Sequence, residues 1–385
     1  MSTLNDVVIN KLSGGLGRRT PEQDMVSGLL FDGETTGEFE ADKVERLASL
    51  EDAKDFGITE DNDLNGQSVY YQVQQFFRLN PSGDLYIMKT AANSYEDIAG
   101  KAFDMQQKAN GNIRQMAIIY SGATTFEDTQ DAVAVAQTQA ELAFADYMPF
   151  EVILEGKGFD RNDVPSLAGK SANVSVVVAM DVKKAEKYPN SAAVGLALGA
   201  VSKAKVSENI AWIEKFNLTG EGFSQAGFVG GEEIKTLSQL RELNDNRFIF
   251  ARTHTGLAGI YFNDSSTCTA DTSDFAYIEN NRTINKATRL LRTALLPKLT
   301  SPVLVDIDGK LPQSVSKSFE GLCRSALEGM VANQEVSAFD VYVDPKQNIL
   351  ATSELKIKAE ITPIGTARKI TVDLGFKNPF GIDKA

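Results

Sequence analysis

The sequence predicts an α/β fold, α+β over the whole chain, in which helices flank a mixed or mainly parallel sheet. Three observations carry this prediction. Apolar runs of strand length alternate with helical patterns in the first half of the chain. The 385 residues, 42% of them apolar and 24% charged, suffice for a large core and for two or three domains. Near the C-terminus, apolar and polar residues alternate as in strands with one covered face.

Two helices come first. Ser49 is a typical N-cap residue for a short helix that ends at Gly57, and a longer helix runs from Asn65 or Ser68 to Arg78. The segments that follow alternate between strand and helix patterns, at residues 85–89, 95–108, 115–120, 128–147, 150–155, 174–180 and 191–205, the sixth being a second consecutive strand. This order predicts βαβ units with right-handed crossovers, and therefore a buried sheet.

Two irregular stretches interrupt the second half of the chain. The glycine-rich residues 220–231 are the first candidate for a domain boundary or a mobile loop, and the polar residues 263–267 form the other stretch. The regular elements expected there are a helix over 237–243, a strand over 248–252, and helices over 284–295 and 314–332. We therefore expect four parts: an N-terminal arm (1–22), an N-terminal and central α/β domain (23–235), a C-terminal domain (236–362) and a C-terminal arm (363–385).

Both ends of the chain carry short strand patterns. The apolar positions are Val7, Val8 and Ile9 at one end, and Leu355, Ile357, Ile361, Ile370, Val372, Leu374 and Phe376 at the other. A terminal strand without a partner can add to the sheet of a second molecule, where main-chain hydrogen bonds supply affinity. A hairpin formed by the two C-terminal stretches with each other explains their pattern equally well.

The charge distribution points away from nucleic acid as a partner. The net charge of −13 would repel phosphates. Residues 20–63 contain fourteen acidic and three basic residues, whereas residues 282–385 contain fifteen basic and eleven acidic ones. Opposite patches of this kind favour head-to-tail contact between copies, although a solvated acidic face explains the first stretch as well.

The sequence contains no long apolar stretch and no signal-peptide pattern at its start. We therefore expect neither membrane insertion nor secretion. Cys268 and Cys323 are far apart in sequence and lack the spacing of metal ligands, so both thiols are expected to be free.

The motifs that suggest chemistry are incomplete. Residues 169–171 (Gly-Lys-Ser) resemble part of a phosphate loop but precede a strand instead of joining a strand to a helix. Residues 61–66 match half of an EF-hand loop, whose twelfth position here is Gln72 and not a carboxylate. His254 is the only histidine, and residues 314–317 fit S-x-x-K without the companion motifs. We predict no catalytic residue, no cofactor and no metal, and hence no enzyme.

The order of these segments resembles the tail sheath proteins of contractile phages and phage-like injection systems, especially those of the Bacteroidota type. Residues 49–57 (SLEDAKDFG) are similar to the S-x-x-E/D-A-x-x-x-F-G segment of many sheath subunits. Residues 73–81 (VQQFFRLNP) precede the strand YIMK as the corresponding sheath helix does, and residues 189–195 (PNSAAVG) are similar to the small-residue helix of that family. The strand ending at Arg252-Thr253, residues 275–278 (FAYI) and the long helix after them resemble the sheath C-terminal domain.

The resemblance implies a tail-sheath-like fold with extended arms. It implies subunits that stack as hexameric rings around an inner tube, in a helical array that shortens and drives the tube through a target envelope. The implied partners are further copies of the chain, the inner tail tube protein, and baseplate and tail terminator proteins, with no nucleic acid and no direct membrane insertion. The implied location is the virion tail or an injection particle, assembled in the bacterial cytoplasm.

The resemblance also assigns roles to the terminal strands and to one helix. The strand residues named above would join the sheets of neighbouring subunits, with glycines 14, 15 and 17 as hinges. Deleting residues 1–20, or cutting after Thr362, is then expected to leave a folded monomer that cannot polymerise. Cations recur every three or four positions on the last-third helix, at Arg282, Lys286, Arg289 and Arg292. They are a candidate contact for an acidic neighbour or the tube, and reversing two of them is expected to disturb assembly; a solvated face is the alternative.

Two other functions fit parts of the sequence. An α/β enzyme or ligand-binding protein with an unrecognised site would place His254 and nearby aspartates in a well-formed pocket. A baseplate or tube-adapter component would also have exposed strands, but would form a ring of fixed size.

Overall fold

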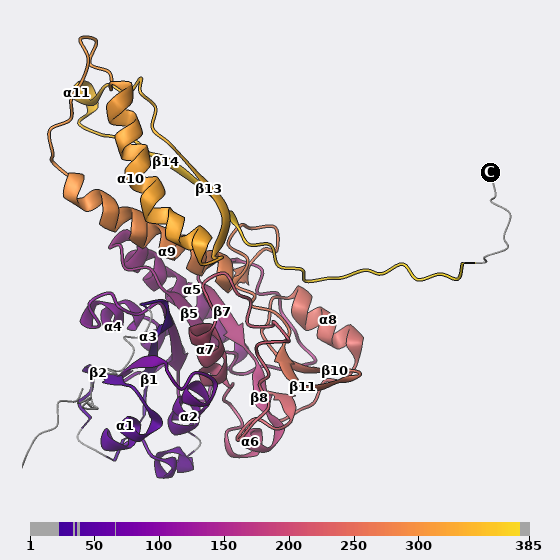
Figure 1. Cartoon of the computed structure of the whole chain (residues 1–385). Helices are drawn as coiled ribbons and strands as arrows, with labels where there is room; N and C mark the ends of the chain where they lie inside the picture. The colour runs from indigo at the N-terminus through magenta and orange to yellow at the C-terminus, as the bar shows by residue number, and fades with distance from the viewer. Residues whose placement is uncertain (1–22, 34, 37–38, 66, 378–385) are drawn as a thin grey trace, which may run out of the picture.

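The computed structural model describes residues 23–377 except 34, 37–38 and 66. A broad body holds the first three quarters of the chain, and an elongated lobe rises from it (Figure 1). The N-terminal arm, with Val7, Val8 and Ile9, lies outside the described residues.

A six-stranded sheet forms the centre of the body, in the order β2-β3-β1-β4-β5-β7. The strands are β1 (Val26–Phe31), β2 (Val44–Leu47), β3 (Asp84–Lys89), β4 (Gln115–Ile119), β5 (Glu151–Glu155) and β7 (Val174–Val177). All neighbours run parallel except the edge strand β2, which confirms the predicted mainly parallel sheet. The sequence analysis missed β1, although all six of its residues are buried. A central strand covered on both faces does not show alternation, which explains the omission.

Helices cover both faces of this sheet. One face packs against α2 (Val69–Leu79) and α7 (Val194–Lys203), and the other against α3 (Tyr95–Ala99), α4 (Ala102–Lys108) and α5 (Phe126–Ala145). Successive strand residues alternate between the two cores, as Ala117 and Ile118 of β4 do. The helix predicted over 95–108 is two helices, because the first ends at Gly100.

Close helix packing explains the small residues near position 195. A Cβ atom added at Gly195 would lie 2.1 Å from the backbone oxygen of Gln72, and one at Gly199 would lie 2.9 Å from that of Phe76. The side-chain amide of Gln72 joins the two helices: it donates to Ala192 O at 2.6 Å and accepts from Gly195 N at 2.7 Å. Backbones that approach this closely leave room for hydrogen alone.

The rest of the body consists of short elements. They are η1 (Gln23–Met25), α1 (Leu50–Asp55), η2 (Glu60–Asn65), β6 (Lys170–Ser171), β8 (Ala179–Asp181), α6 (Val182–Lys187), β9 (Ala226–Phe228), α8 (Leu237–Asp245), β10 (Ala251–His254), β11 (Leu257–Phe262) and β12 (Cys268–Thr269). The glycine-rich stretch 220–231 packs within the body and does not separate two domains, which corrects the predicted boundary at this stretch. Phe223 is fully buried, Gly222 O accepts the hydroxyl of Tyr71 at 3.1 Å, and β9 pairs with β8.

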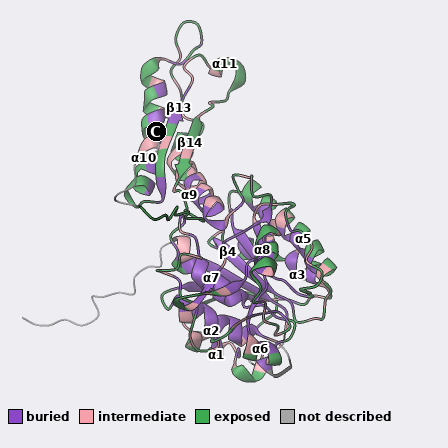
Figure 2. Ribbon diagram, turned by 90° about the vertical axis from the view of Figure 1, so that its right-hand side faces the viewer, coloured by how far each residue is buried: buried purple, intermediate pink, exposed green. Residues whose placement is uncertain are grey.

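The lobe has a separate small core. It consists of the end of α9 (Ile278–Leu295), η3 (Leu296–Lys298), α10 (Gln313–Ala332), β13 (Val336–Tyr342), α11 (Ile349–Thr352) and β14 (Lys358–Pro363). Figure 2 shows the lobe largely exposed above a mostly buried body. The body's cores continue to Ile278, so residues 236–278 pack with the body, whereas the predicted boundary assigned them to the C-terminal domain. Helix α9 therefore connects the two parts.

Candidate functional site

The first C-terminal stretch pairs within its own chain. β14 runs antiparallel to β13, with Ile361 opposite Phe339, and Ile357 and Ile361 pack against the lobe core. Leu355 is half-buried. We expected this stretch to join another subunit. In the structure one edge of β14 is already paired with β13 of the same chain, and a role for its outer edge between subunits stays a prediction. Pairing with a strand of the same chain does not cost the translational and rotational entropy that two separate molecules lose on association, which favours the internal pair.

The second stretch has the opposite environment. The exposed fractions of its apolar side chains are 81% for Ile370, 76% for Val372, 95% for Leu374 and 110% for Phe376. Residues 369–377 form no strand and run away from the molecule as a single extended segment (Figure 1). The hairpin between the two stretches is therefore absent from the described residues, since the partner of β14 is β13. The role of this second stretch between subunits stays a prediction.

The four cations of α9 have partners within the same chain. Arg282 is buried and donates to the backbone oxygens of Asp24 and Ala204, at 3.0 and 3.2 Å. Arg289 pairs with the carboxylate of Asp24 at 2.5 Å. The guanidinium of Arg292 lies 3.5 Å from the ring centre of Tyr147.

Lys286 completes the cluster, because its ammonium lies 2.6 Å from Asp24 and 2.7 Å from Glu335. The predicted basic surface for a neighbour or tube is therefore an internal contact between the body, the lobe and the root of the N-terminal segment. The sequence analysis missed its acidic partners, because Asp24 and Glu335 are 265 and 49 positions away from the cations they bind and no local spacing links them.

Reversing the charge of Lys286 should destabilise the fold. Lys286→Glu would place three carboxylates together in a site where Asp24 and Glu335 are 14% and 8% exposed. We expect the free energy of unfolding to fall by about 3 kcal/mol or more, the usual cost of an uncompensated charge in a mostly buried ion pair. Denaturant unfolding measures this loss. Lys183→Glu, at an exposed lysine without an ion pair in the described structure, is the control, and equal losses in both variants would contradict the internal role.

Glu151 is a buried carboxyl beside this cluster. It starts β5, and its Oε1 accepts from the side-chain amides of Asn285 on α9 at 2.8 Å and Asn173 at 3.0 Å. Its Oε2 has no partner in the described structure. Burial raises its pKa to about 8 against the opposing effects of these hydrogen bonds and of Arg282. Glu151 is therefore mostly protonated at neutral pH and joins the sheet to α9 as a neutral group.

The raised pKa of Glu151 predicts a loss of stability at alkaline pH. The folded chain holds this proton up to about pH 8, whereas the unfolded chain releases it near the ordinary value of 4.5. Stability from this group is therefore full below pH 4.5 and falls as pH rises toward 8, by at most about 1.4 kcal/mol per pH unit. Glu151→Gln keeps a neutral acceptor at every pH. Between pH 5 and 9, the free energy of unfolding of the variant should rise relative to that of the parent as pH increases. A difference between the two that does not change with pH would contradict this assignment.

The other candidate motifs have structural roles. Lys170 and Ser171 form β6, which pairs with β12 and not with a phosphate-binding helix. Asp63 accepts the backbone N–H groups of Tyr70 and Tyr71 at 3.1 and 2.9 Å, at the start of α2. The acidic segment therefore serves a helix N-terminus and not a calcium loop. His254 is half-exposed on β10, and burial together with Arg252 lowers its pKa.

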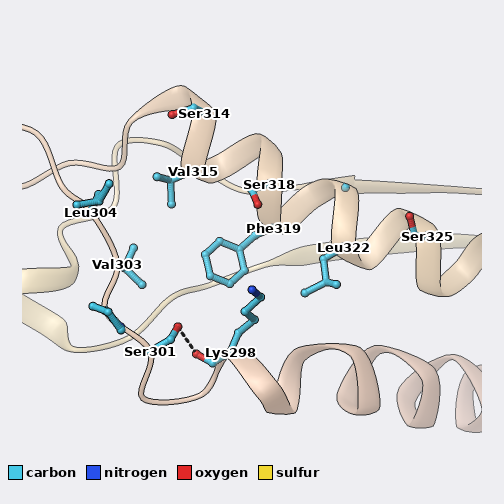
Figure 3. Close-up of a pocket in the computed structure, with 12 residues that line it drawn as sticks. Lys298, Ser301, Val303, Leu304, Ser314, Val315, Ser318, Phe319, Leu322 and Ser325 are labelled. Carbon is cyan, nitrogen blue, oxygen red and sulfur yellow. Dashed lines mark hydrogen bonds between the residues drawn. The ribbon is translucent and has the colours of Figure 1, made fainter.

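The lobe contains an open groove of about 520 Å³ between α10 and residues 298–304. Figure 3 shows Phe319 and Leu322 of α10 facing Val303 and Lys298, with serines around them. The lining contains no histidine, cysteine or carboxylate. Among the described residues, no three potential ligands gather as a metal site, and Cys268 and Cys323 are free and buried. Within the same residues, none of the helices combines the length and apolar character needed to cross a membrane.

Comparison with known proteins gives the family and the fold. The family model "DUF2586, N-terminal domain" matches residues 4–266, and "DUF2586, C-terminal domain" matches residues 274–381. A comparison with curated protein sequences found no match.

Among solved structures, the helical sheath of the anti-feeding prophage in its contracted state has a TM-score of 0.69 at 16% identity, covering 98% of this chain and all of the other. A chain of the six-fold symmetrised baseplate of that particle has a TM-score of 0.68 at 15% identity with the same coverage. The sheath tail protein of Desulfitobacterium hafniense has a TM-score of 0.55 at 10% identity, covering 93% of this chain and all of the other. The chain thus has the fold of contractile sheath proteins, as the segment order predicted, and it belongs to the DUF2586 family.

Proposed function

We propose that this chain is a structural, non-enzymatic subunit of a contractile sheath, which polymerises as stacked hexameric rings around an inner tube and contracts to drive the tube through a target envelope. The observation that carries the proposal is the exposed stretch 370–376 on a chain with the sheath fold. Four apolar side chains in solvent at alternate positions are unfavourable in an isolated molecule. A second copy that covers them removes this cost.

The acceptor that we propose is the β13–β14 hairpin of a second copy. Within the described residues this hairpin is a two-stranded sheet, so the outer edge of each strand has no partner strand. A strand formed by residues 370–376 would add there through main-chain hydrogen bonds. Burying its four apolar side chains would contribute roughly 6 to 12 kcal/mol before ordering costs. The same role for Val7, Val8 and Ile9 remains a prediction.

The remaining partners follow from this role. Besides further copies of the chain, they are an inner tail tube protein and baseplate and tail terminator proteins. The particle would be a virion tail or a phage-like injection device assembled in the bacterial cytoplasm. The likeness to chains of both a sheath and a baseplate supports membership of such a particle.

Electron microscopy of the purified full chain tests the function. A sheath subunit should give long helical tubes at high protein concentration, because each copy both donates and accepts a strand. Closed rings of one size would favour a baseplate or adapter component instead. Isolated globules at every concentration would overturn the proposal.

A further inference from the structure

A buried pair of carboxylates lies on the body where the C-terminal segment leaves it. Glu279 in the first turn of α9 and Asp264 in the loop before β12 have side chains that are 3% and 12% exposed. Asn209 holds them together, since its amide donates to Asp264 Oδ1 at 2.6 Å and to Glu279 Oε1 at 3.1 Å. The hydroxyl of Ser265 also donates to Glu279. Two carboxylates held this close and this deep repel each other unless a cation lies between them.

Arg368 supplies that cation. Its Nε lies 2.9 Å from Asp264 Oδ2 and its Nη2 lies 2.5 Å from Glu279 Oε1. The guanidinium carbon lies 3.3 Å from the ring centre of Tyr277, which adds a cation–π contact. A planar guanidinium can meet two carboxylates and a ring at once, which the point charge of lysine cannot do. We refer to Arg368, Asp264, Glu279 and Tyr277 as the arm clasp.

Arg368 lies between the last strand of the lobe and the exposed C-terminal stretch. β14 ends on the lobe at Pro363, and the exposed apolar stretch begins at Ile370. Among the described residues after β14, Arg368 alone has a side chain with an ion pair to the body. The segment therefore leaves from a fixed point on the body and not from the tip of the lobe.

The chain entering the body at the other end is held in a similar way. Asp24, directly after the N-terminal segment, binds Lys286 and Arg289 of α9, while Glu279 of the same helix binds Arg368. Helix α9 thus ties down the roots of both terminal segments, by cations for one and by a carboxylate for the other.

We propose that the arm clasp fixes where and in which direction residues 369–377 leave their own subunit, so that a second copy of the chain meets them in one preset orientation. A segment anchored at its root loses less conformational entropy on binding than a free one. The benefit exists only for a chain that polymerises, so this proposal rests on the proposed function. The anchoring itself is measurable on the unassembled chain.

The experiment uses double electron–electron resonance to measure the distance between two spin labels on the full chain at low protein concentration. Spin labels are attached through Thr371→Cys on the segment and Arg241→Cys on α8, because the native Cys268 and Cys323 are buried. The parent should give a narrow distance distribution and Arg368→Gln a broad one. Lys369→Gln, at the next cation, which has no ion pair in the described structure, is the matched control and should stay narrow. An unchanged distribution in Arg368→Gln would overturn the proposal.

A second variant separates loosening from misfolding. Arg368→Gln leaves both Glu279 and Asp264 without their cation. Adding Glu279→Gln leaves only the Asp264 carboxylate, which keeps the hydrogen bonds from Asn209 and from the backbone N–H of Ser265. Both should broaden the distribution and raise the protein concentration needed for tube formation by about tenfold. A narrow distribution in the double variant would also overturn the proposal. If the parent shows the arm clasp but forms no tubes, the proposed function fails while the anchoring stands.

Discussion

Removing residues 364–385 is expected to leave a folded chain that no longer polymerises. The cut falls after Pro363, the last residue of β14, so the hairpin with β13 stays intact and the lobe core is kept. It removes Arg368 and the four exposed apolar side chains of residues 370–376. Losing several kcal/mol of burial per contact should raise the concentration needed for assembly at least about a hundredfold. Sedimentation and negative-stain microscopy measure the loss.

Two further variants identify the cause of that loss. The first replaces all four apolar residues with serine and keeps the full chain length; it should abolish assembly. These residues are Ile370, Val372, Leu374 and Phe376. Changing the intervening polar residues, Thr371→Ser and Asp373→Asn, should leave assembly unchanged, because only one face of a strand is covered in this way. Normal tubes from the truncated chain would rule out the donated strand.

Replacing Gly195 is expected to destabilise the fold strongly. The added Cβ of Gly195→Ala would lie 2.1 Å from Gln72 O, and this atom belongs to the backbone of α2, which cannot move without separating the two helices. We expect a loss of about 3 kcal/mol, the upper range for overpacking, out of a total stability of roughly 5 to 15 kcal/mol. Gly195→Val should unfold much of the chain. Thermal and denaturant unfolding measure both losses.

The chain contains a matched control for this change. Gly321 is also inside a helix, α10, but a Cβ there would meet nothing within 4 Å. Gly321→Ala should therefore raise stability, by about 0.4 to 1 kcal/mol, because alanine restricts the unfolded chain. Changes of the same sign at both positions would show that helix propensity, and not the contact with Gln72, controls the result.

The predicted sheet order was accurate where local pattern and burial coincide. The strands at 85–89, 115–120 and 150–155 were predicted because each is a short apolar run next to a predicted helix. β3, β4 and β5 lie within one residue of these limits. The N-cap at Ser49 was equally local, since its hydroxyl accepts from Asp52 N three residues away. The resemblance of these segments and of their order to sheath subunits implied the sheath fold.

The errors concern choices between partners. The cations of α9 repeat at helical spacing whether they face solvent or Asp24, because spacing records the helix and not the partner. Ile357 and Ile361 alternate with polar residues whether they pack against the lobe core or against a strand from another molecule. β13 itself was missed, because several of its side chains are exposed on a small lobe and its pattern is weak.

The sequence alone determined the α/β class, the main strands and helices, and a C-terminal stretch whose apolar face needs a cover. Each of these features depends on residues a few positions apart, so a short segment of the chain is enough to specify it. Only the tertiary structure decided which stretch is covered internally and which stays exposed, and that Asp24, Glu279 and Arg368 hold the roots of the terminal segments. Those contacts join residues 89 and 265 positions apart, and charge complementarity at such separations is decided by the fold that brings the groups together.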